Sequence, residues 1–387
     1  MTQAVTRWLL QEGRRAPDAP TLLQGLLPRL DAVVSVQRMY VGTSVLHPQA
    51  AAYAWVLEQG RPLRELVFSW EKMASLDDVD SPLGRLRAGA PCVRLRRGEG
   101  TDLPDVVALW DAGYTDFYAE SLQLRGEWSG GFTFATTDAG GYPDDAVAAL
   151  HEVVPVLSAV LEPLTRDAMY GTLLQTYLGG DAGRRVTSGQ VRRGDGQRLR
   201  AAIWFSDVRG FTTLSNAIDE GELLSLLDDV FGAVVAAVQQ HGGEVLKFIG
   251  DGALAIFPVQ GNGAAAEAAA CRASMDAALT LQGALATIRQ RRKARNAPEP
   301  YVGVGLHFGD LMYGNIGAPT RLDFTVIGPN VNLAARVEGL CAATGYDVLA
   351  TRSVARHATG WAALGEHRVK GVADAVTVFT PGVRAAR

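Results

Sequence analysis

The sequence predicts a protein of the α+β class with two domains. Its 387 residues exceed the length of one typical domain. Hydrophobic residues make up 48% of the chain and charged residues 20%, a composition typical of soluble globular proteins with enough apolar material for two cores. Segments with helical and strand periodicity follow one another in both halves. Together these observations favour helices packed on sheets in each domain.

Charge and hydropathy exclude two function classes. The net charge of -4 gives no basic field for nucleic-acid binding. The chain contains no apolar run of about 18 residues, so we expect no membrane span. The best candidate, residues 147–161, is interrupted by His151, Glu152 and Pro155. The first residues, MTQAVTRWLLQEGRR, lack the pattern of a signal peptide.

The cysteines indicate a reducing compartment. Cys92, Cys271 and Cys341 are odd in number and far from any CxxC spacing. Disulfides and a zinc site are therefore not expected, and we interpret all three as small buried hydrophobic residues in a cytoplasmic protein.

The N-terminal half has mixed α and β character. Helical spacing covers residues 18–30, a region near 103–118, and residues 144–161, whereas residues 38–46 and 131–136 have strand character. A second helix is expected over residues 163–180, ending at paired glycines. Residues 181–200 are polar and basic. We therefore predict a first domain over residues 1–162, a helical linker over 163–197 and a second domain over 198–382.

The second domain shows sharper patterns. We expect a buried strand at AAIWFSD, an amphipathic helix over residues 222–240, and a strand, tight turn and strand in GEVLKFIGDGALAIF. An alanine-rich helix over residues 264–293 follows, then a strand at YVGVGLHFG and a hairpin through residues 313–327. A helix over residues 330–343 precedes three short strands at DVLAT, HRVKGV and AVTVFT.

Two aspartates are candidate ligands of divalent cations. Asp207 ends a buried strand and Asp251 occupies a Gly-Asp-Gly turn, so each carboxylate is exposed at one point and otherwise held rigidly. Carboxylate oxygens suit the cations that accompany triphosphates. The segment with Phe211 and Thr212 follows a glycine, and its backbone N–H groups could meet phosphate oxygens. Taken alone, an aspartate in a glycine-rich turn is usually only a turn former.

The helix beginning near residue 330 carries two more candidates. Asn332 and Arg336 are four residues apart and therefore share one face. An arginine beside an amide suits a phosphate or a developing negative charge. Alone, this pair would be read as an ordinary exposed surface.

Three motifs together resemble a known family. FSDVRGFT, GEVLKFIGDGALAIF and FTVIGPNVNLAARVE occur in this order and are similar to the catalytic domain of class III adenylate/guanylate cyclases. The resemblance covers about residues 198–380. It implies a ferredoxin-like βαββαβ core in an α/β sandwich, ATP as substrate, and two Mg²⁺ or Mn²⁺ ions held by Asp207 and Asp251.

The resemblance also implies the role of each remaining residue. Lys247 and Thr325 occupy the positions that read adenine; guanine readers in the family usually carry Glu and Cys there. Asn332 would orient the ribose, Arg336 would stabilise charge on the α-phosphate, and Lys370 would contact the β- and γ-phosphates. In this family the site lies between two catalytic domains, so a head-to-tail homodimer with two composite sites is implied.

Two positions depart from the commoner pattern. Thr325 stands where many members have Asp, which makes adenine selectivity less secure than with a Lys–Asp pair. Pro329-Asn330 replaces a frequent Gly-Asp step. The expected function is an adenylate cyclase in signal transduction, regulated by its N-terminal domain. The alternatives are a guanylate cyclase and a catalytically silent nucleotide-binding signalling module.

The N-terminal domain gives less information. Its order of elements weakly resembles a GAF-like sensory domain, an antiparallel sheet with helices. The sequence has no Asn before Asn216, so the Asn-Lys motif of cyclic-nucleotide-binding GAF domains is absent. Its aromatic residues could form the core, which we favour, or line a pocket for an unknown small ligand.

Overall fold

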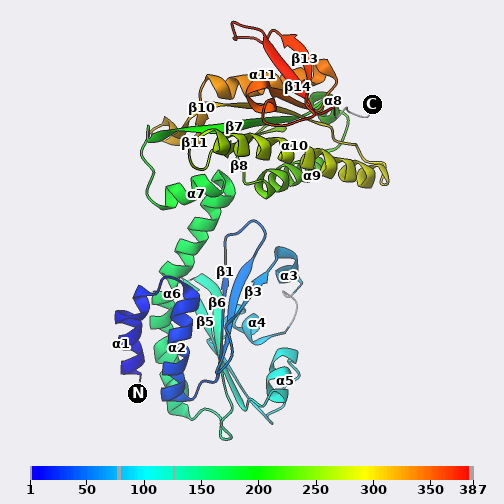
Figure 1. Ribbon diagram of the computed structural model, residues 1–387. Helices are drawn as coiled ribbons and strands as arrows, with labels where there is room; N and C mark the ends of the chain where they lie inside the picture. Colours follow the sequence, from blue (N-terminus) through cyan, green and yellow to red (C-terminus); the bar gives the residue numbers. More distant parts are fainter. Residues whose placement is uncertain (1, 76–79, 125–126, 383–387) are drawn as a thin grey trace. The chain divides into compact units, whose positions relative to one another are not determined.

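The chain folds into two compact units, Met1–Leu173 and Leu174–Arg387 (Figure 1). The computed structural model describes residues 2–75, 80–124 and 127–382. Both units combine an antiparallel-dominated sheet with helices, which confirms the predicted α+β class.

The first unit is built on a six-stranded antiparallel sheet in the order β3-β2-β1-β6-β5-β4. Its strands are β1 (Arg38–Ser44), β2 (Ala52–Glu58), β3 (Arg64–Phe68), β4 (Cys92–Arg96), β5 (Asp116–Leu124) and β6 (Glu127–Thr136). The helices are α1 (Gln3–Gln11), η1 (Gly13–Arg15), α2 (Ala19–Val34), α3 (Trp70–Ala74), α4 (Pro82–Arg87), α5 (Pro104–Asp111) and α6 (Asp144–Leu178). The GAF-like assignment of this unit stays a prediction.

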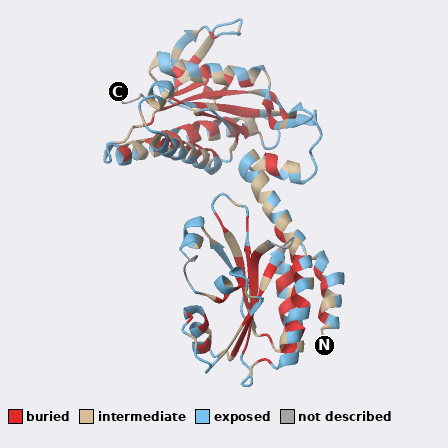
Figure 2. Cartoon of the chain, turned by 180° about the vertical axis from the view of Figure 1, so that it is seen from behind, coloured by how far each residue is buried: buried red, intermediate tan, exposed pale blue. Residues whose placement is uncertain are grey.

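Each face of this sheet has its own core. Helices α2 and α6 pack on one face, where buried leucines of α2 meet Met39, Phe132 and Phe134 (Figures 1 and 2). Helices α4 and α5 contribute to a smaller cluster with Phe117 and Ala119 on the other face. Because successive side chains of a strand point to opposite faces, Phe117 and Tyr118 belong to different cores.

Helix α6 is longer than the sequence predicted. The expected helices over residues 144–161 and 163–180 form one continuous helix, with Pro155 and Pro163 inside it. Among the described helices, α6 is the one that is long and apolar enough to cross a membrane by length and composition. Leu150, Val153 and Leu157 of this helix pack in the core of the first unit.

The second unit contains an eight-stranded sheet in the order β13-β14-β12-β10-β7-β9-β8, with β11 paired to β10. Its strands are β7 (Gly196–Val208), β8 (Glu244–Ile249), β9 (Gly252–Pro258), β10 (Val302–Ala318), β11 (Arg321–Ile327), β12 (Val348–Thr351), β13 (Ala362–His367) and β14 (Val376–Thr380). The helices are α7 (Gly180–Thr187), α8 (Phe211–Ser215), α9 (Glu220–Gln240), α10 (Ala264–Lys293), α11 (Pro329–Thr344) and α12 (Arg352–Ala355). The succession β7-α9-β8-β9-α10-β10, with spatial order β10-β7-β9-β8, is the predicted ferredoxin-like βαββαβ core.

Strand β10 separates two layers of helices. Val302, Val304, Leu306 and Phe308 face the core formed with α9 and α10. The alternate positions, Gly303, Gly305 and Gly309, face α11. A Cβ atom at Gly305 would lie 2.3 Å from the backbone nitrogen of Glu338, so glycine lets α11 rest directly on the strand.

Two local predictions were wrong. HRVKGV was expected to be a strand, but β13 ends at His367 and Lys370 lies in the turn that follows. Cys271 and Cys341 are buried as expected, whereas Cys92 is exposed on the edge strand β4. All three cysteines are free thiols.

Candidate active site

The structure brings Asp207 and Asp251 together. Asp207 lies one residue before the end of β7, and Asp251 occupies the turn between β8 and β9. Burial and the adjacent charge of Asp251 raise the pKa of Asp207 to about 6. A divalent cation bound between these two carboxylates would relieve their mutual repulsion, so the donor pair fits a divalent metal ion. Within the described residues no cluster of three or more His, Cys, Asp or Glu side chains could hold a metal.

A third carboxyl group, Glu338 of α11, lies behind this pair. Its Oε1 would lie 2.6 Å from a Cβ at Gly303, the residue paired with Asp207 across β7 and β10. Burial, with the charges of Asp207 and Asp251, raises the pKa of Glu338 to about 7, while Arg209 opposes this shift. Sequence analysis missed Glu338, which lies two residues after Arg336 and therefore on a different face of α11.

Arg209 fixes the backbone that follows Asp207. Its guanidinium donates to the carbonyl of Cys341 at 3.0 Å and to that of Tyr346, and forms an ion pair with Asp347 at 3.1 Å. Strand β7 is thereby tied to the C-terminal end of α11. Gly210, with a φ of 68°, then turns the chain into α8, where Phe211 is half-buried and Thr212 is exposed.

A β-bulge directs Lys247 toward the β10–β11 hairpin. The register of β8 against β9 shifts between Val245, opposite Ala255, and Lys247, opposite Leu254. Ala255 belongs to the core with α9 and α10, whereas Leu254 belongs to the cluster that includes β11 residues. Strict alternation would have placed Lys247 on the same face as Val245, beneath the helices.

Lys247 forms an ion pair with Asp323 of β11. Its Nζ donates to Oδ2 of Asp323 at 2.7 Å. Thr325, two residues further along β11, is 5% exposed, and its hydroxyl is buried without a hydrogen-bond partner in the described structure. The predicted pair of Lys247 and Thr325 is therefore not a direct contact in this chain. Asp323 is a site residue that sequence analysis missed.

The remaining candidates are exposed. Asn332 and Arg336 lie on α11, and Lys370 lies in the turn after β13. In the described parts of the chain these three side chains form no hydrogen bond or ion pair among the residues of one subunit. Asp207 and Asp251 thus lie at one place, and Lys247 and Thr325 at another. In the described structure, Asn332 and Arg336 form no hydrogen bond or ion pair with either group.

Asn330, one of the departures from the family pattern, has a structural role. Its amide nitrogen donates to the carbonyl of Asp310 at 2.8 Å, and its oxygen lies 3.1 Å from Nε2 of His307. Gly309 leaves room for this side chain. Asn330 therefore holds the first turn of α11 against β10.

The second unit is similar to proteins of one known family. Residues 197–380 match the family model of the Adenylate and Guanylate cyclase catalytic domain. The adenylate cyclase of Anabaena cylindrica is 33% identical over 171 residues, which cover 43% of this chain and 32% of that protein. The chain spans about a third of the length of the curated relatives it matches.

Two solved structures are also similar. The adenylyl cyclase CyaB from P. aeruginosa is 26% identical with a TM-score of 0.44, over 48% of this chain and 94% of that chain. The guanylyl cyclase Cya2 is 27% identical with a TM-score of 0.41, over 48% of this chain and 92% of that chain.

Proposed function

We propose that the protein, whose residues 197–380 match the catalytic domain of adenylate and guanylate cyclases, converts ATP into 3′,5′-cyclic AMP and pyrophosphate. The single observation that carries the proposal is the close approach of Asp207 and Asp251, which suits two divalent cations. Divalent ions bound there would lower the pKa of the ribose 3′-hydroxyl and offset the charge of the triphosphate.

The reaction requires one bond to form and one to break. The ribose 3′-oxygen loses its proton and attacks the α-phosphorus, while the bond from that phosphorus to the bridging oxygen of the β-phosphate breaks. Arg336 donates to the α-phosphate oxygens as charge moves onto them, and its removal would cost on the order of 3 kcal/mol of transition-state stabilisation. Asn332 holds the ribose, and Lys370, Phe211 and Thr212 hold the triphosphate, the last two through backbone N–H groups.

Adenine preference is supported by the direction of Lys247. The bulge in β8 turns its ammonium group toward β11, where one proton is donated to Asp323. An ammonium group carries three protons, so two remain for a ring nitrogen of the base. The unpartnered hydroxyl of Thr325 can accept from the exocyclic amine of adenine.

The proposed assembly is a head-to-tail homodimer in which each site combines residues of two chains. Asn332 and Arg336 are exposed, as expected for side chains that act on a substrate held by a partner. Apolar side chains near the base-reading strands are also exposed, namely Phe248 (47%), Ile249 (47%) and Ile327 (49%). Exposed apolar side chains of this kind favour association. The N-terminal unit is proposed to regulate this dimer.

The test measures cyclic AMP and cyclic GMP formed by the purified chain with Mn²⁺ and either ATP or GTP. We expect cyclic AMP from ATP, and none from Asp207→Ala. Faster turnover of GTP would make the protein a guanylate cyclase. A folded wild type that forms no more product than Asp207→Ala would make it a nucleotide-binding module without turnover.

The dimer is tested separately by complementation. Asp207→Ala and Arg336→Ala are each expected to be inactive, and their mixture should recover activity because one composite site of the mixed dimer is intact. An inactive mixture, with subunit exchange demonstrated by differently labelled chains, would rule out the shared site.

A further inference from the structure

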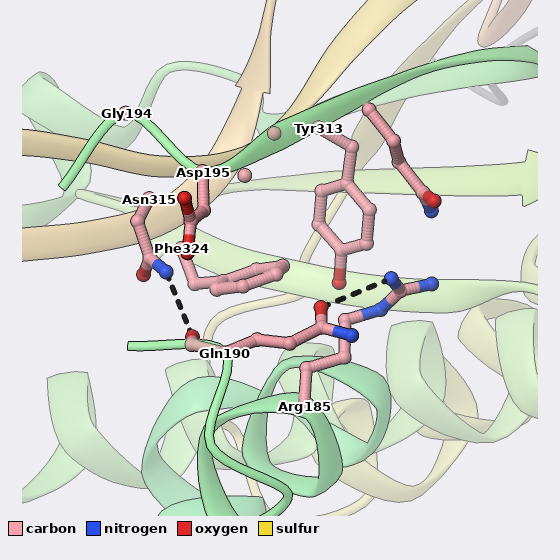
Figure 3. A pocket seen from close by; sticks show the side chains of 10 residues that line it. Arg185, Gln190, Gly194, Asp195, Tyr313, Asn315 and Phe324 are labelled. Atoms are coloured by element: carbon pink, nitrogen blue, oxygen red, sulfur yellow. Dashed lines mark hydrogen bonds between the residues drawn. The ribbon is translucent and has the colours of Figure 1, made fainter. Parts of the chain in front are cut away.

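Two polar side chains of β10, Asn315 and His307, are buried. The amide of Asn315 donates through Nδ2 to the carbonyl of Gln190 at 2.8 Å, beside a cavity of about 390 Å³ (Figure 3). Asn315 thereby fastens the segment before β7 to the strand. His307 lies earlier on β10, and its contacts reach a different element, the first turn of α11.

The amide of Asn330 attaches this first turn to the strand. Its Nδ2 donates to the carbonyl of Asp310 at 2.8 Å, and a reversed amide would bring two oxygens together there. The amide oxygen is therefore the atom that lies 3.1 Å from Nε2 of His307. Because an amide oxygen only accepts hydrogen bonds, Nε2 must carry an imidazole proton.

The other imidazole nitrogen faces two hydroxyl groups. Nδ1 of His307 lies 2.8 Å from the Thr351 hydroxyl and 3.3 Å from that of Ser353, and the two hydroxyls are 2.9 Å apart. Ser353 Oγ also accepts from the backbone N–H of Phe308 at 3.1 Å. The shortest set of bonds therefore runs from Ser353 to Thr351 and from Thr351 to Nδ1, so that every hydroxyl proton has an acceptor.

Burial keeps this imidazole neutral. His307 is 8% exposed, and burial lowers its pKa. A second proton, on Nδ1, would place a charge in this buried position and would force the Thr351 hydroxyl to reverse its direction. The ring is therefore held in one tautomer, with Nε2–H as a fixed donor to Asn330.

The contact with Asn330 determines where the rest of α11 begins. Gly309 leaves the space for it, because a Cβ atom there would lie 2.5 Å from Cγ of Asn330. Asn332 follows in the same turn, where its backbone N–H donates to the carbonyl of Gly328 at 3.3 Å. Arg336 lies one turn further along the helix. The position of the first turn thus sets the positions of both Asn332 and Arg336.

We propose that His307 is a positioning residue for the reaction: its Nε2–H holds Asn330, and Asn330 holds the first turn of α11 so that Asn332 and Arg336 meet the substrate correctly. His307 itself touches no reacting atom. This inference rests on the proposed function, because it assigns the effect of His307 to the cyclisation step. A displacement of about 1 Å in a positioned group can slow a reaction by about 100-fold.

Two substitutions separate the two bonds of the imidazole. The side-chain nitrogen introduced by His307→Gln can replace Nε2 as the donor to Asn330, whereas the shorter side chain of His307→Asn can replace only Nδ1. Each variant loses one buried hydrogen bond, so their melting temperatures should fall by similar amounts. The kcat for cyclic AMP should fall about 10- to 100-fold in His307→Asn and less than about 3-fold in His307→Gln. The KM for ATP should change less than about 3-fold in both, because Lys247 and Asp323 do not move.

Asn330→Ala removes the acceptor and should lower kcat as much as His307→Asn does. Combining the two substitutions should add little, because His307 acts through Asn330. Asn330 is half-buried, so this variant tests the inference even if the His307 variants do not fold. The matched control is His241→Asn, whose imidazole also contacts a threonine, Thr280 at 2.9 Å, but lies at the end of α9. Its kcat should equal that of the wild type.

Equal losses of kcat in His307→Asn and His307→Gln, or additive losses in the double variant, would show that His307 only stabilises the fold and would overturn the inference. A normal kcat in Asn330→Ala would overturn it too. Amide hydrogen exchange at Asn332 gives a readout without turnover and should be faster in His307→Asn than in His307→Gln. If the wild type forms no cyclic nucleotide, the proposed function fails. Equal exchange in the two variants would then overturn the positioning of α11 by His307, and faster exchange in His307→Asn would support it.

Discussion

Lys247 donates to the carboxylate of Asp323 at 2.7 Å, although Thr325 occupies the position where a partner of Lys247 was predicted. The ion pair is partly exposed, with 33% of the Lys247 side chain and 50% of the Asp323 side chain accessible. An exposed pair of this kind contributes at most about 1 kcal/mol to stability. In the proposed function, the main effect of the pair is to orient the lysine toward the base.

Replacing Asp323 should therefore affect substrate binding more than folding. For Asp323→Asn we expect the KM for ATP to rise about 3- to 10-fold, because the ammonium group loses a charge-assisted partner. The melting temperature should change little. Asp310→Asn, on the adjacent strand with its side chain 74% exposed, is the control. Steady-state kinetics check both variants, and an unchanged KM in Asp323→Asn would remove Asp323 from the site.

Thr325→Val tests the buried hydroxyl. Valine has the same shape, and the hydroxyl has no partner among the described residues, so the free protein should be as stable as wild type or more stable. The kcat/KM for ATP should fall about 3- to 10-fold if the hydroxyl accepts from adenine. Thermal melting and kinetics give the two readouts.

Thr351→Val is the matched comparison. The Thr351 hydroxyl is also buried, but it lies 2.8 Å from Nδ1 of His307 and 2.9 Å from Ser353. Its loss leaves buried polar atoms unpaired and should cost about 1–3 kcal/mol. Equal destabilisation by the two substitutions would show that Thr325 has an unrecognised partner.

The raised pKa of Asp207 predicts a pH dependence of the metal-free protein. The folded state holds a proton on Asp207 up to pH of about 6, whereas the unfolded chain releases it near the usual value of 3.8. The stabilising contribution is therefore complete below pH of about 4 and is lost as the pH rises through 6. At pH 7.5 without metal, Asp207→Asn should be more stable by about 1 kcal/mol, a value reduced for partial exposure.

Thermal melting between pH 4 and 8 checks this prediction, with Asp276→Asn on the exposed side of α10 as the control. The advantage of Asp207→Asn should disappear near pH 4. Added Mn²⁺ should stabilise the wild type and not the variant. An Asn variant that is less stable than wild type at pH 7.5 would contradict the assigned repulsion between the two aspartates.

Gly305→Ala tests the contact between β10 and α11. The added Cβ would lie 2.3 Å from the Glu338 nitrogen and 2.7 Å from the Ala334 carbonyl oxygen, both of them backbone atoms that cannot rotate away. We expect a loss of about 2 kcal/mol or more and a loss of activity as Asn332 and Arg336 move. Gly283→Ala in α10, with no atom within 4 Å, should instead stabilise by up to about 1 kcal/mol. Denaturant unfolding distinguishes the two variants.

Local sequence patterns were sufficient to predict most elements of the second unit. The apolar spacing of α9 and the alanine-rich run of α10 are strong local signals, and the glycines around Asp251 predicted its turn. These predictions depend on residues that are close together in the chain. That Asp207 and Asp251, 44 residues apart, lie near each other was expected only from the family resemblance.

Features that depend on register or on tertiary packing were not predicted. The bulge at Lys247 breaks strict alternation, and the sequence of β8 gives no glycine to mark it. Pro163 was expected to separate two helices, but the burial of Leu161 and Thr165 on either side of it accompanies a continuous α6. Glu338 is significant only because Gly303 places its carboxyl beside strand β7.

The glycines of β10 also determine how substitutions are tolerated in this part of the fold. At Gly305 of β10, the strand contacts backbone atoms of α11. A larger side chain at this strand position therefore cannot be accommodated by changing any side chain of α11. Exposed helix positions such as Asn332 and Arg336 have no such constraint on shape. Selection for folding should therefore act strongly on the glycines of the strand and weakly on these exposed positions. If a saturation mutagenesis library tolerates only a few amino acids at Asn332 or Arg336, that restriction would report activity alone.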